Sequence, residues 1–408
     1  MTFEPTRAAG LKALADFLPK AGGSYAARRN YDLGAAGHPH VSRLSPWMRH
    51  RLVSETEVLR AVLGRHSASA AEKFIQEVYW RTYWKGWLEM RPGVWRQYRD
   101  GVAAARNRLA TEGGLRRDWE AACTGDTGID CFDHWARELV ATGYLHNHAR
   151  MWFASIWVFT LRLPWELGAD FFLRHLLDGD PASNTLGWRW VAGIQTPGKT
   201  YLARPDNIAR YTEGRFDPRG QLAEHADPIP APPPPPRMAA PTGDRPDPAL
   251  RTGWLMTEDD LLAGFPDLPP GDAGLPLCLM PCDDLRSPLA TAPHVRGFTA
   301  AAMGDAAARH AGMFAEPVTA SGHGRIEQVL DWAATRGLRQ VVMPHAPAGP
   351  AGDACGDLCK ALAAEGIALR RILRPHDARA WPHATHGFFR FKEKIPALLA
   401  DLGGLRAA

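Results

Sequence analysis

The sequence predicts a multidomain protein, with an all-α domain first and a smaller, Rossmann-like parallel α/β domain after it. The chain has 408 residues, which is more than one hydrophobic core usually serves. Apolar residues recur at helical spacing before a proline-rich segment, whereas short apolar runs alternate with helical stretches after it. We therefore predict a helical domain at residues 1–222, a linker at 223–250 and an α/β domain at 251–408.

Helical periodicity dominates the first domain, and the period-two alternation of strands is nearly absent from it. The expected helices cover residues 10–18, 54–63, 69–88, 132–142, 146–159, 166–177 and 188–191. The most apolar stretch, residues 151–161, has 11 residues and is too short to span a bilayer. We interpret it as a buried core helix.

The linker prediction depends on residues 227–236, which are mostly proline. Each proline lacks an N–H group and fixes φ, so this run fits neither a helix nor a central strand. We expect an extended polyproline segment that spaces the two domains. Recognition by an SH3-type module is the alternative role for such a segment.

The second domain combines strand-like and helical stretches in alternation. Strands are expected at residues 277–281, 295–299, 340–344 and 367–373, with helices at 300–311, 325–336, 353–365 and 388–402. This order predicts a parallel sheet covered by helices. The sequence has neither G-x-G-x-x-G nor G-x-x-x-x-G-K-S/T, so it carries no nucleotide-binding fingerprint of these kinds.

Composition limits the partners and the compartment. The formal charge is +4, and only 8 of the 48 basic residues are lysine. Arginine suits phosphate recognition, although codon bias in a GC-rich genome explains the same excess. The 6 cysteines are too thinly spread for a disulfide framework or a usual zinc site, and residues 1–22 lack the apolar stretch of a secretory signal. We expect no metal and a cytoplasmic location.

Polar and aromatic residues gather between residues 146 and 190. Asn147 and Met151 are four apart and share a helix face, and Arg150 lies on the next turn from Asn147. A buried arginine needs a partner, so we expect Arg150 to pair with Asp178. The residues alone indicate a polar site in a helical bundle or, for the turn after residue 177, ordinary loop chemistry.

Five ordered motifs resemble the flavin domain of the photolyase/cryptochrome family. They are the segments at residues 25–30 (YAARRN), 42–46 (SRLSP), 77–81 (EVYWR), 142–151 (TGYLHNHARM) and 177–190 (LDGDPASNTLGWRW), with Thr127-Gly128 as a further match. The resemblance covers about residues 8–220. It implies a helical fold that binds a U-shaped FAD.

The resemblance also implies a set of cofactor-binding residues. They are Tyr25, Ser42, Arg43, Leu44, Ser45, Phe74, Arg81, Asn147, Arg150, Asp178, Asp180 and Asn184. Tyr25, the Ser42–Ser45 segment and Arg81 would lie near the adenine and phosphates. The Arg150–Asp178 pair and Asp180 would face the isoalloxazine ring. The Asn184 carboxamide would face flavin N5, because it can serve either protonation state there.

Substrate and electron-transfer roles follow in the same way. Glu77, Trp80, Asn147, Met151 and Trp190 would line the cavity for a flipped-out pyrimidine dimer, and Glu77, Asn184, Trp188 and Trp165 would act in catalysis. The branch that repairs (6-4) photoproducts carries a histidine pair at the positions of Asn147 and Met151, so the resemblance favours cyclobutane dimers. His146 and His148 do not match that pair, and we place them behind the site or at the surface.

The relay of tryptophans is incomplete by this comparison. Trp188 and Trp165 match its two inner members, and residues 107–114 hold no match for the outermost one. Trp119, Trp135 and Trp157 are the candidates to replace it.

The second domain resembles part of the family's antenna domain at residues 366–369 and 387–394, which indicates a permuted domain order and leaves the antenna chromophore open. We expect a monomeric, light-dependent enzyme that repairs cyclobutane pyrimidine dimers in damaged DNA and has no membrane partner. A cryptochrome-like photoreceptor without repair activity is the alternative. A DNA-binding module that has lost its flavin is a second one.

Overall fold

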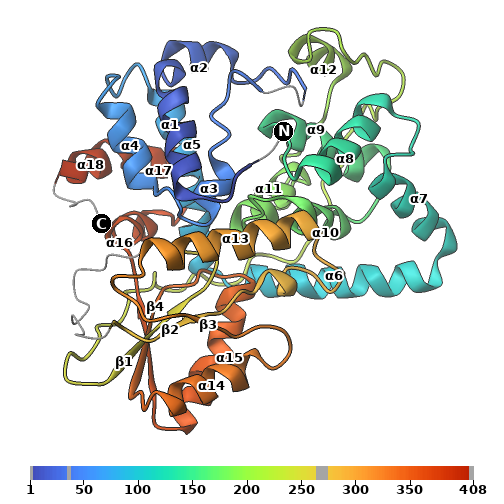
Figure 1. The fold of residues 1–408 in the computed structure, drawn as a ribbon. Helices are drawn as coiled ribbons and strands as arrows, with labels where there is room; N and C mark the ends of the chain where they lie inside the picture. Colours follow the sequence, from blue (N-terminus) through green and yellow to red (C-terminus); the bar gives the residue numbers. More distant parts are fainter. Residues whose placement is uncertain (1–2, 35–37, 263–273, 404–408) are drawn as a thin grey trace.

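The computed structural model describes residues 3–34, 38–262 and 274–403. A helical part formed by the first half of the chain packs on a sheet with its own helices, formed by the second half (Figure 1). The helices of the first part are α1 (Arg7–Phe17), α2 (Gly23–Arg28), α3 (Ser45–Arg49), α4 (Glu55–Leu63), α5 (Glu72–Glu89), α6 (Gly93–Thr111), α7 (Gly113–Thr124), α8 (Asp130–Thr142), α9 (Asn147–Ser155), α10 (Trp165–His175), α11 (Pro181–Val191) and α12 (Pro205–Tyr211).

Local sequence signals set several of these helix ends. Ser54 and Glu57 form a capping box at the start of α4. Asp180 caps α11 by accepting a bond from the Ser183 amide, and Pro181 fills the first turn, where its missing N–H costs nothing. At the end of α8, Gly143 adopts φ 69°, a left-handed conformation that suits glycine.

Most expected helices of this part are confirmed, with shifted ends. Residues 146–159 form α9 followed by a π-helical turn, Ile156–Thr160, rather than one regular helix. The long helix α6 and its neighbour α7 were missed, because the arginine-rich sequence of α6 has few large apolar residues. No described helix has the length and apolarity to cross a membrane.

The proline-rich segment lies as an extended strap without helix or strand between α12 and the first strand. Pro235 packs against Gly93, and the Met238 amide donates to the Met90 carbonyl at 2.8 Å. Further along, the Asp244 amide donates to the Arg371 carbonyl at 2.8 Å. The strap therefore connects the α5–α6 turn with the far edge of the sheet.

The second part contains a five-stranded parallel sheet of order β3-β2-β1-β4-β5, which confirms the predicted α/β class. Its strands are β1 (Thr252–Met256), β2 (Leu277–Leu279), β3 (Val318–Thr319), β4 (Gln340–Pro344) and β5 (Ala368–Ile372). Its helices are α13 (Pro293–Arg309), α14 (Arg325–Thr335), α15 (Pro350–Ala364), α16 (Pro375–Ala380), α17 (Phe388–Lys392) and α18 (Ile395–Ala400). The strand expected at 295–299 is wrong: Pro293 opens α13 there, and the helix continues into an alanine-rich run.

The central strand β1 was also missed by the sequence prediction. All five of its residues are buried, so it lacks the alternation that marks a half-exposed strand. Its register joins Trp254 to Leu277 on one side and to Val342 on the other. β1 therefore places the segment that follows it, Thr257–Asp260, at the carboxyl edge of the sheet.

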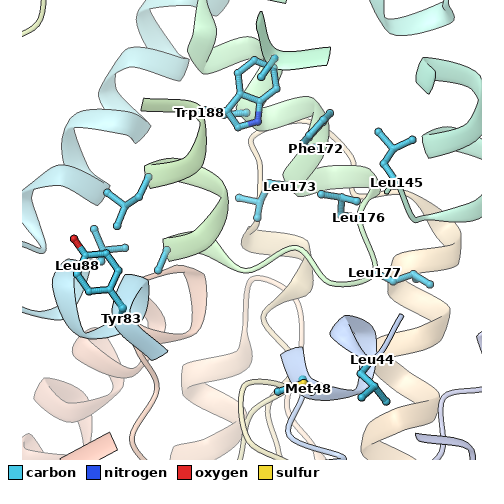
Figure 2. Packing of buried hydrophobic residues seen from close by; sticks show 14 of the residues in the cluster. Leu44, Met48, Tyr83, Leu88, Leu145, Phe172, Leu173, Leu176, Leu177 and Trp188 are labelled. Atoms are coloured by element: carbon cyan, nitrogen blue, oxygen red, sulfur yellow. The ribbon is translucent and has the colours of Figure 1, made fainter. Parts of the chain in front are cut away.

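The two parts share one hydrophobic core and a set of buried ion pairs. Arg49 pairs with Asp259, and Arg51 Nη1 lies 3.1 Å from Asp260 Oδ2. Arg51 Nη2 is also 2.6 Å from Asp377 Oδ2. Figure 2 shows part of the buried apolar cluster, including Phe172 and Leu176 of the helical part. The carboxyl edge of the sheet thus faces the helices that carry the predicted site.

Candidate functional site

The loop between α10 and α11, residues 176–180, carries two predicted site acids. Arg150 Nη2 donates to Asp178 Oδ2 at 2.8 Å, so the predicted pair is present. Arg150 Nε donates to the Leu145 carbonyl at 3.0 Å, and its guanidinium lies 5.5 Å from the Tyr144 ring centroid. These contacts hold the pair at the start of α9.

Asp180 lies two residues further along the same loop. Its side chain is 2% exposed and faces Arg81 Nη2 at 3.4 Å and Lys85 Nζ at 3.6 Å. Burial opposes ionisation of Asp180, but Arg81 and Lys85 outweigh it and hold its pKa far below the ordinary value. Arg81, expected at the adenine and phosphates, therefore lies beside Asp180, and its Nε is also 3.7 Å from Glu55 Oε1.

Helices α2 and α5 carry a further group of predicted site residues. The Tyr25 and Phe74 rings meet edge to face at 5.1 Å. Arg29 Nη1 donates to Glu77 Oε1 at 2.7 Å, and burial nevertheless raises the pKa of Glu77. Burial and then the Glu77 carboxylate raise the pKa of Tyr25, so these two groups lie near each other. Sequence reasoning did not identify Arg29 as a member of this group of residues.

The Ser42–Ser45 segment leads into α3. The Leu44 amide donates to Ser42 Oγ at 3.4 Å, and the Leu44 side chain is buried in the core (Figure 2). Arg43 has φ 53°, a left-handed conformation that is costly for a residue with a side chain. Burial raises the pKa of Tyr144, while Arg150, Asp178 and Arg43 all contribute to its electrostatics. Arg43 and the Arg150–Asp178 pair thus surround one ring.

Helix α11 carries Asn184 and Trp188. Asn184 Nδ2 donates to the Ala169 carbonyl at 2.8 Å, which fixes the carboxamide one turn after Asp180. Trp188 is buried, and its Nε1 has no hydrogen-bond partner among the described residues. The Trp157 ring lies 6.1 Å from it in a T-shaped contact, so Trp157 is the candidate relay residue that the structure brings to Trp188.

The second predicted relay residue, Trp165, has other aromatic neighbours. Its ring lies 5.8 Å from Tyr98, and Tyr98 lies 5.2 Å from Trp95. Trp95 Nε1 donates to Asp353 Oδ2 at 2.9 Å, in the second part of the chain. This aromatic row was not anticipated, because Tyr98 and Trp95 stand in α6, a helix that the sequence analysis missed.

The predicted substrate residues are less closely organised. Trp80 stacks on Phe388 of α17, with ring centroids 3.7 Å apart and an interplanar angle of 11°. Trp190 is 36% exposed and stacks on Tyr201 at 5.5 Å. Asn147 and Met151 stand one turn apart on α9. One face of Trp80 is therefore occupied by the protein itself.

A pocket of about 350 Å³ adjoins Tyr201. Its lining is Asn30, His148, Tyr201, Leu202, Arg204, Asn207 and Tyr211. His148 bonds through Nδ1 to the Asn30 carbonyl at 3.0 Å and stacks on Trp152 at 4.1 Å. His146 is 1% exposed, so it lies behind the site and not at the surface.

The polar atoms of the site that lack a hydrogen-bond partner suit the groups of a flavin ring. Asp178 Oδ1 and Arg81 Nε are buried and have no hydrogen-bond partner in the described part of the chain. A flavin ring offers both an N–H donor and carbonyl acceptors, which are the groups that these two atoms need. Arg43, an electrostatic neighbour of Tyr144, would supply a cation for the diphosphate. The residues present thus match FAD.

Comparison with known proteins agrees with this fit. Residues 74–226 match the family described as the FAD binding domain of DNA photolyase. A deoxyribodipyrimidine photo-lyase of Streptomyces griseus is 34% identical over 183 residues, covering 44% of this chain and 37% of that protein. The corresponding protein of Thermus thermophilus is 33% identical over 218 residues, covering 53% and 49%. A chloroplastic/mitochondrial cryptochrome DASH of Ostreococcus tauri is 32% identical over 192 residues, covering 46% and 34%.

Solved structures give similar matches. A bacterial class III photolyase from Agrobacterium tumefaciens aligns with a TM-score of 0.44 at 27% identity, over 52% of this chain and 43% of that one. An archaeal photolyase from Sulfolobus tokodaii with two FAD molecules aligns with a TM-score of 0.39 at 24% identity, over 55% and 52%. The chain spans less than half the length of the curated relatives described above. Residues 74–226 thus correspond to the FAD-binding domain of DNA photolyases.

Proposed function

We propose that this protein is a light-dependent DNA repair enzyme that splits cyclobutane pyrimidine dimers. FAD, held by Arg150, Asp178 and Asn184, would supply the light-driven electron transfer that splits the dimer. The chain's own residues would hold the flavin and present the extruded lesion to it. The catalytic assignments of Glu77, Asn184, Trp188 and Trp165 belong to this proposal.

The observation that carries the proposal is the placement of Glu77 and Trp80 one turn apart on α5. Arg29 Nη1 donates to Glu77 Oε1 at 2.7 Å, and the Glu77 side chain is 32% exposed. A carboxylate there can accept a hydrogen bond from a pyrimidine N–H group. Trp80 stands three residues further along the same helix, where an aromatic face can stack a base.

The proposed cofactor-binding residues would act on the flavin through charges and dipoles that the fold holds in place. Arg150 and Asp178 would neutralise each other against the flavin ring, and Asn184 would present its carboxamide to the ring's reactive nitrogen. The shared core keeps Trp188 dry, so an oxidised indole there would be reduced by a neighbouring aromatic ring and not by solvent. The excess of arginine over lysine in the sequence supports contact with DNA phosphates.

A cryptochrome-like photoreceptor is the second candidate. The stacking of Phe388 on Trp80 favours it, because that contact takes one face of the indole that repair would use. Such a protein would bind FAD and respond to light without acting on DNA.

A repair assay tests the proposal. Photoreduced protein is mixed with an oligonucleotide that carries one thymine dimer, under blue light and in the dark. We expect light-dependent loss of the dimer, which Glu77→Ala reduces at least tenfold and Glu120→Ala, at an exposed site on α7, leaves unchanged. A yellow, photoreducible protein that leaves the dimer intact would rule out repair and support the photoreceptor.

A further inference from the structure

The flavin loop, residues 176–180, is held by one arginine from each part of the chain. Arg286 Nη1 donates to the Leu176 carbonyl at 3.1 Å. Arg49 Nε donates to the Gly179 carbonyl at 2.9 Å. A Cβ atom at Gly179 would lie only 3.0 Å from Arg286 Nη1, so the guanidinium packs directly on the loop backbone. Two arginines therefore fix the peptide groups on either side of Asp178.

Arg286 belongs to the second part of the chain. It follows a 3₁₀ turn, Asp283–Leu285, directly after β2, and it is 3% exposed. Its Nε and Nη2 have no hydrogen-bond partner among the described residues. A buried guanidinium with a single bond is costly to the fold. The loop carbonyl is the partner that the structure gives it, which indicates that the residue serves the loop.

Arg49 links the same loop to the sheet. It pairs with Asp259, which lies just after β1, and its side chain is 2% exposed. Its charge also reaches Asp180, since Arg49 is one of the cations that lower the pKa of that residue. The connection therefore runs from the carboxyl edge of the sheet through Arg49 to the flavin loop.

Further contacts from the α/β part hold the ends of the two helices that flank the loop. At the end of α10, the Ala292 amide donates to the Arg174 carbonyl at 3.1 Å, and His294 Nε2 bonds to the His175 carbonyl at 2.8 Å. At the start of α11, Pro181 packs against Gly349, which precedes α15. Helix ends leave carbonyl groups without intrahelical partners, and here the α/β part supplies the donors.

We propose that Arg286, assisted by Arg49, is a positioning residue for FAD, and that the α/β part acts as the scaffold of the flavin loop. In open α/β sheets, ligands usually bind at the carboxyl edge of the strands. In this chain that edge holds the Arg49–Asp259 and Arg51–Asp260 pairs and faces the flavin loop. The inference rests on the FAD site and is independent of whether the protein repairs DNA.

Arg286→Met tests the proposal through FAD affinity. It removes a charged donor from the Leu176 carbonyl, so we expect the FAD dissociation constant to rise 10-fold to 100-fold. The measurement is titration of the apoprotein with FAD, followed by flavin fluorescence, together with visible circular dichroism of the bound flavin. Arg296→Met is the matched control, because Arg296 is 65% exposed and lies 3.9 Å from Asp283.

Thermal unfolding of the apoprotein separates positioning from a purely structural role. Replacing Arg286 by methionine removes a cation near Glu258 and Asp283, so the apoprotein melting temperature is measured beside the FAD affinity. Weaker FAD binding with an unchanged or higher apoprotein melting temperature supports the proposal. Unchanged affinity overturns it, and so does a loss of affinity that only follows a lower melting temperature.

A second variant keeps the test valid if Arg286→Met does not fold. Gly179→Ala places a methyl group 3.0 Å from Arg286 Nη1 and 3.1 Å from the Leu176 carbonyl oxygen, so it disturbs this same contact without changing any charge. We expect it to displace the guanidinium and weaken FAD binding about tenfold, with altered visible circular dichroism. FAD binding and a flavin spectrum equal to those of the unsubstituted protein would contradict the proposal.

Discussion

The two sides of the candidate site differ in how far the protein alone organises them. On the cofactor side, the acids Asp178 and Asp180 already have cationic partners, and the loop between them is fixed by two arginines. On the substrate side, Trp80 stacks on a phenylalanine from α17 and Trp190 lies partly exposed. The proposed cofactor side is therefore already organised by contacts within the protein, whereas a base at Trp80 would have to use the other face of its ring or displace Phe388.

The largest effect on stability and FAD binding is expected from a substitution on the cofactor side. Arg150→Met leaves Asp178, whose side chain is 3% exposed, without its cation. Removal of one partner of a buried ion pair costs about 4 kcal/mol, so we expect the free energy of unfolding to fall by that amount and FAD to be lost. Denaturant unfolding and the flavin-to-protein absorbance ratio measure both.

The matched control for this variant is Arg204→Met. Arg204 pairs loosely with Asp206 at 3.7 Å, and its side chain is 66% exposed. Exposed pairs contribute little, so its unfolding free energy should change by less than about 0.5 kcal/mol. Equal losses in the two variants would contradict the view that the Arg150–Asp178 pair is a buried element of the site.

The ionic layer beneath the flavin loop gives a pH prediction. Burial, and next the carboxylate of Asp259, raise the pKa of Glu258 to about 7. The folded state then holds a proton that the unfolded state has released above about pH 4.5, so the contribution of this group is full below that pH and is lost as pH rises to about 7. The loss amounts to about 3 kcal/mol.

The substitution Glu258→Gln isolates this effect. The glutamine variant should lose less stability between pH 5 and 7.5 than the unsubstituted protein, as measured by urea unfolding at each pH. The comparison cancels the other titrating groups, which both proteins share. Parallel stability curves would mean that Glu258 is ionised in the folded protein and that Arg49 and Arg286 dominate its environment.

A substitution at Phe388 tests whether its ring blocks the substrate side. Phe388→Leu keeps a buried apolar side chain, so it should cost less than about 1.5 kcal/mol of stability. It removes the ring that stacks on Trp80, and base–aromatic stacking contributes roughly 1–3 kcal/mol. We expect affinity for a dimer-containing oligonucleotide to rise about tenfold, measured by fluorescence anisotropy. Phe389→Leu, at an 82% exposed position, is the control and should have no effect.

Sequence reasoning succeeded where the relevant contacts are local or follow a family motif. The Arg150–Asp178 pair lies within the stretch that carries the motif, and the start of α4 after Ser54 depends on neighbouring residues. It failed for Arg49 and Arg286, because their partners are more than a hundred residues away in the chain. No spacing rule connects β2 with the α10–α11 loop.

The same distinction explains the errors in the fold. Helix periodicity is a local signal, and it located most helices of the first part. Strand β1 is buried on both faces and shows no alternation, so only the assembled sheet identifies it. Phe388 was assigned to a closing helix, but its stacking on Trp80 depends on how α17 packs against α5, which is a tertiary contact.

The smallest effect is expected at Trp190, which tests whether the exposed aromatic side takes part in DNA binding. Trp190→Phe keeps an aromatic ring against Tyr201 but reduces the stacking area. Because Trp190 is 36% exposed, stability should change by less than about 1 kcal/mol. Affinity for dimer-containing DNA should fall about threefold while FAD affinity stays constant. A parallel loss of FAD would place Trp190 on the cofactor side and remove the contrast between the two sides.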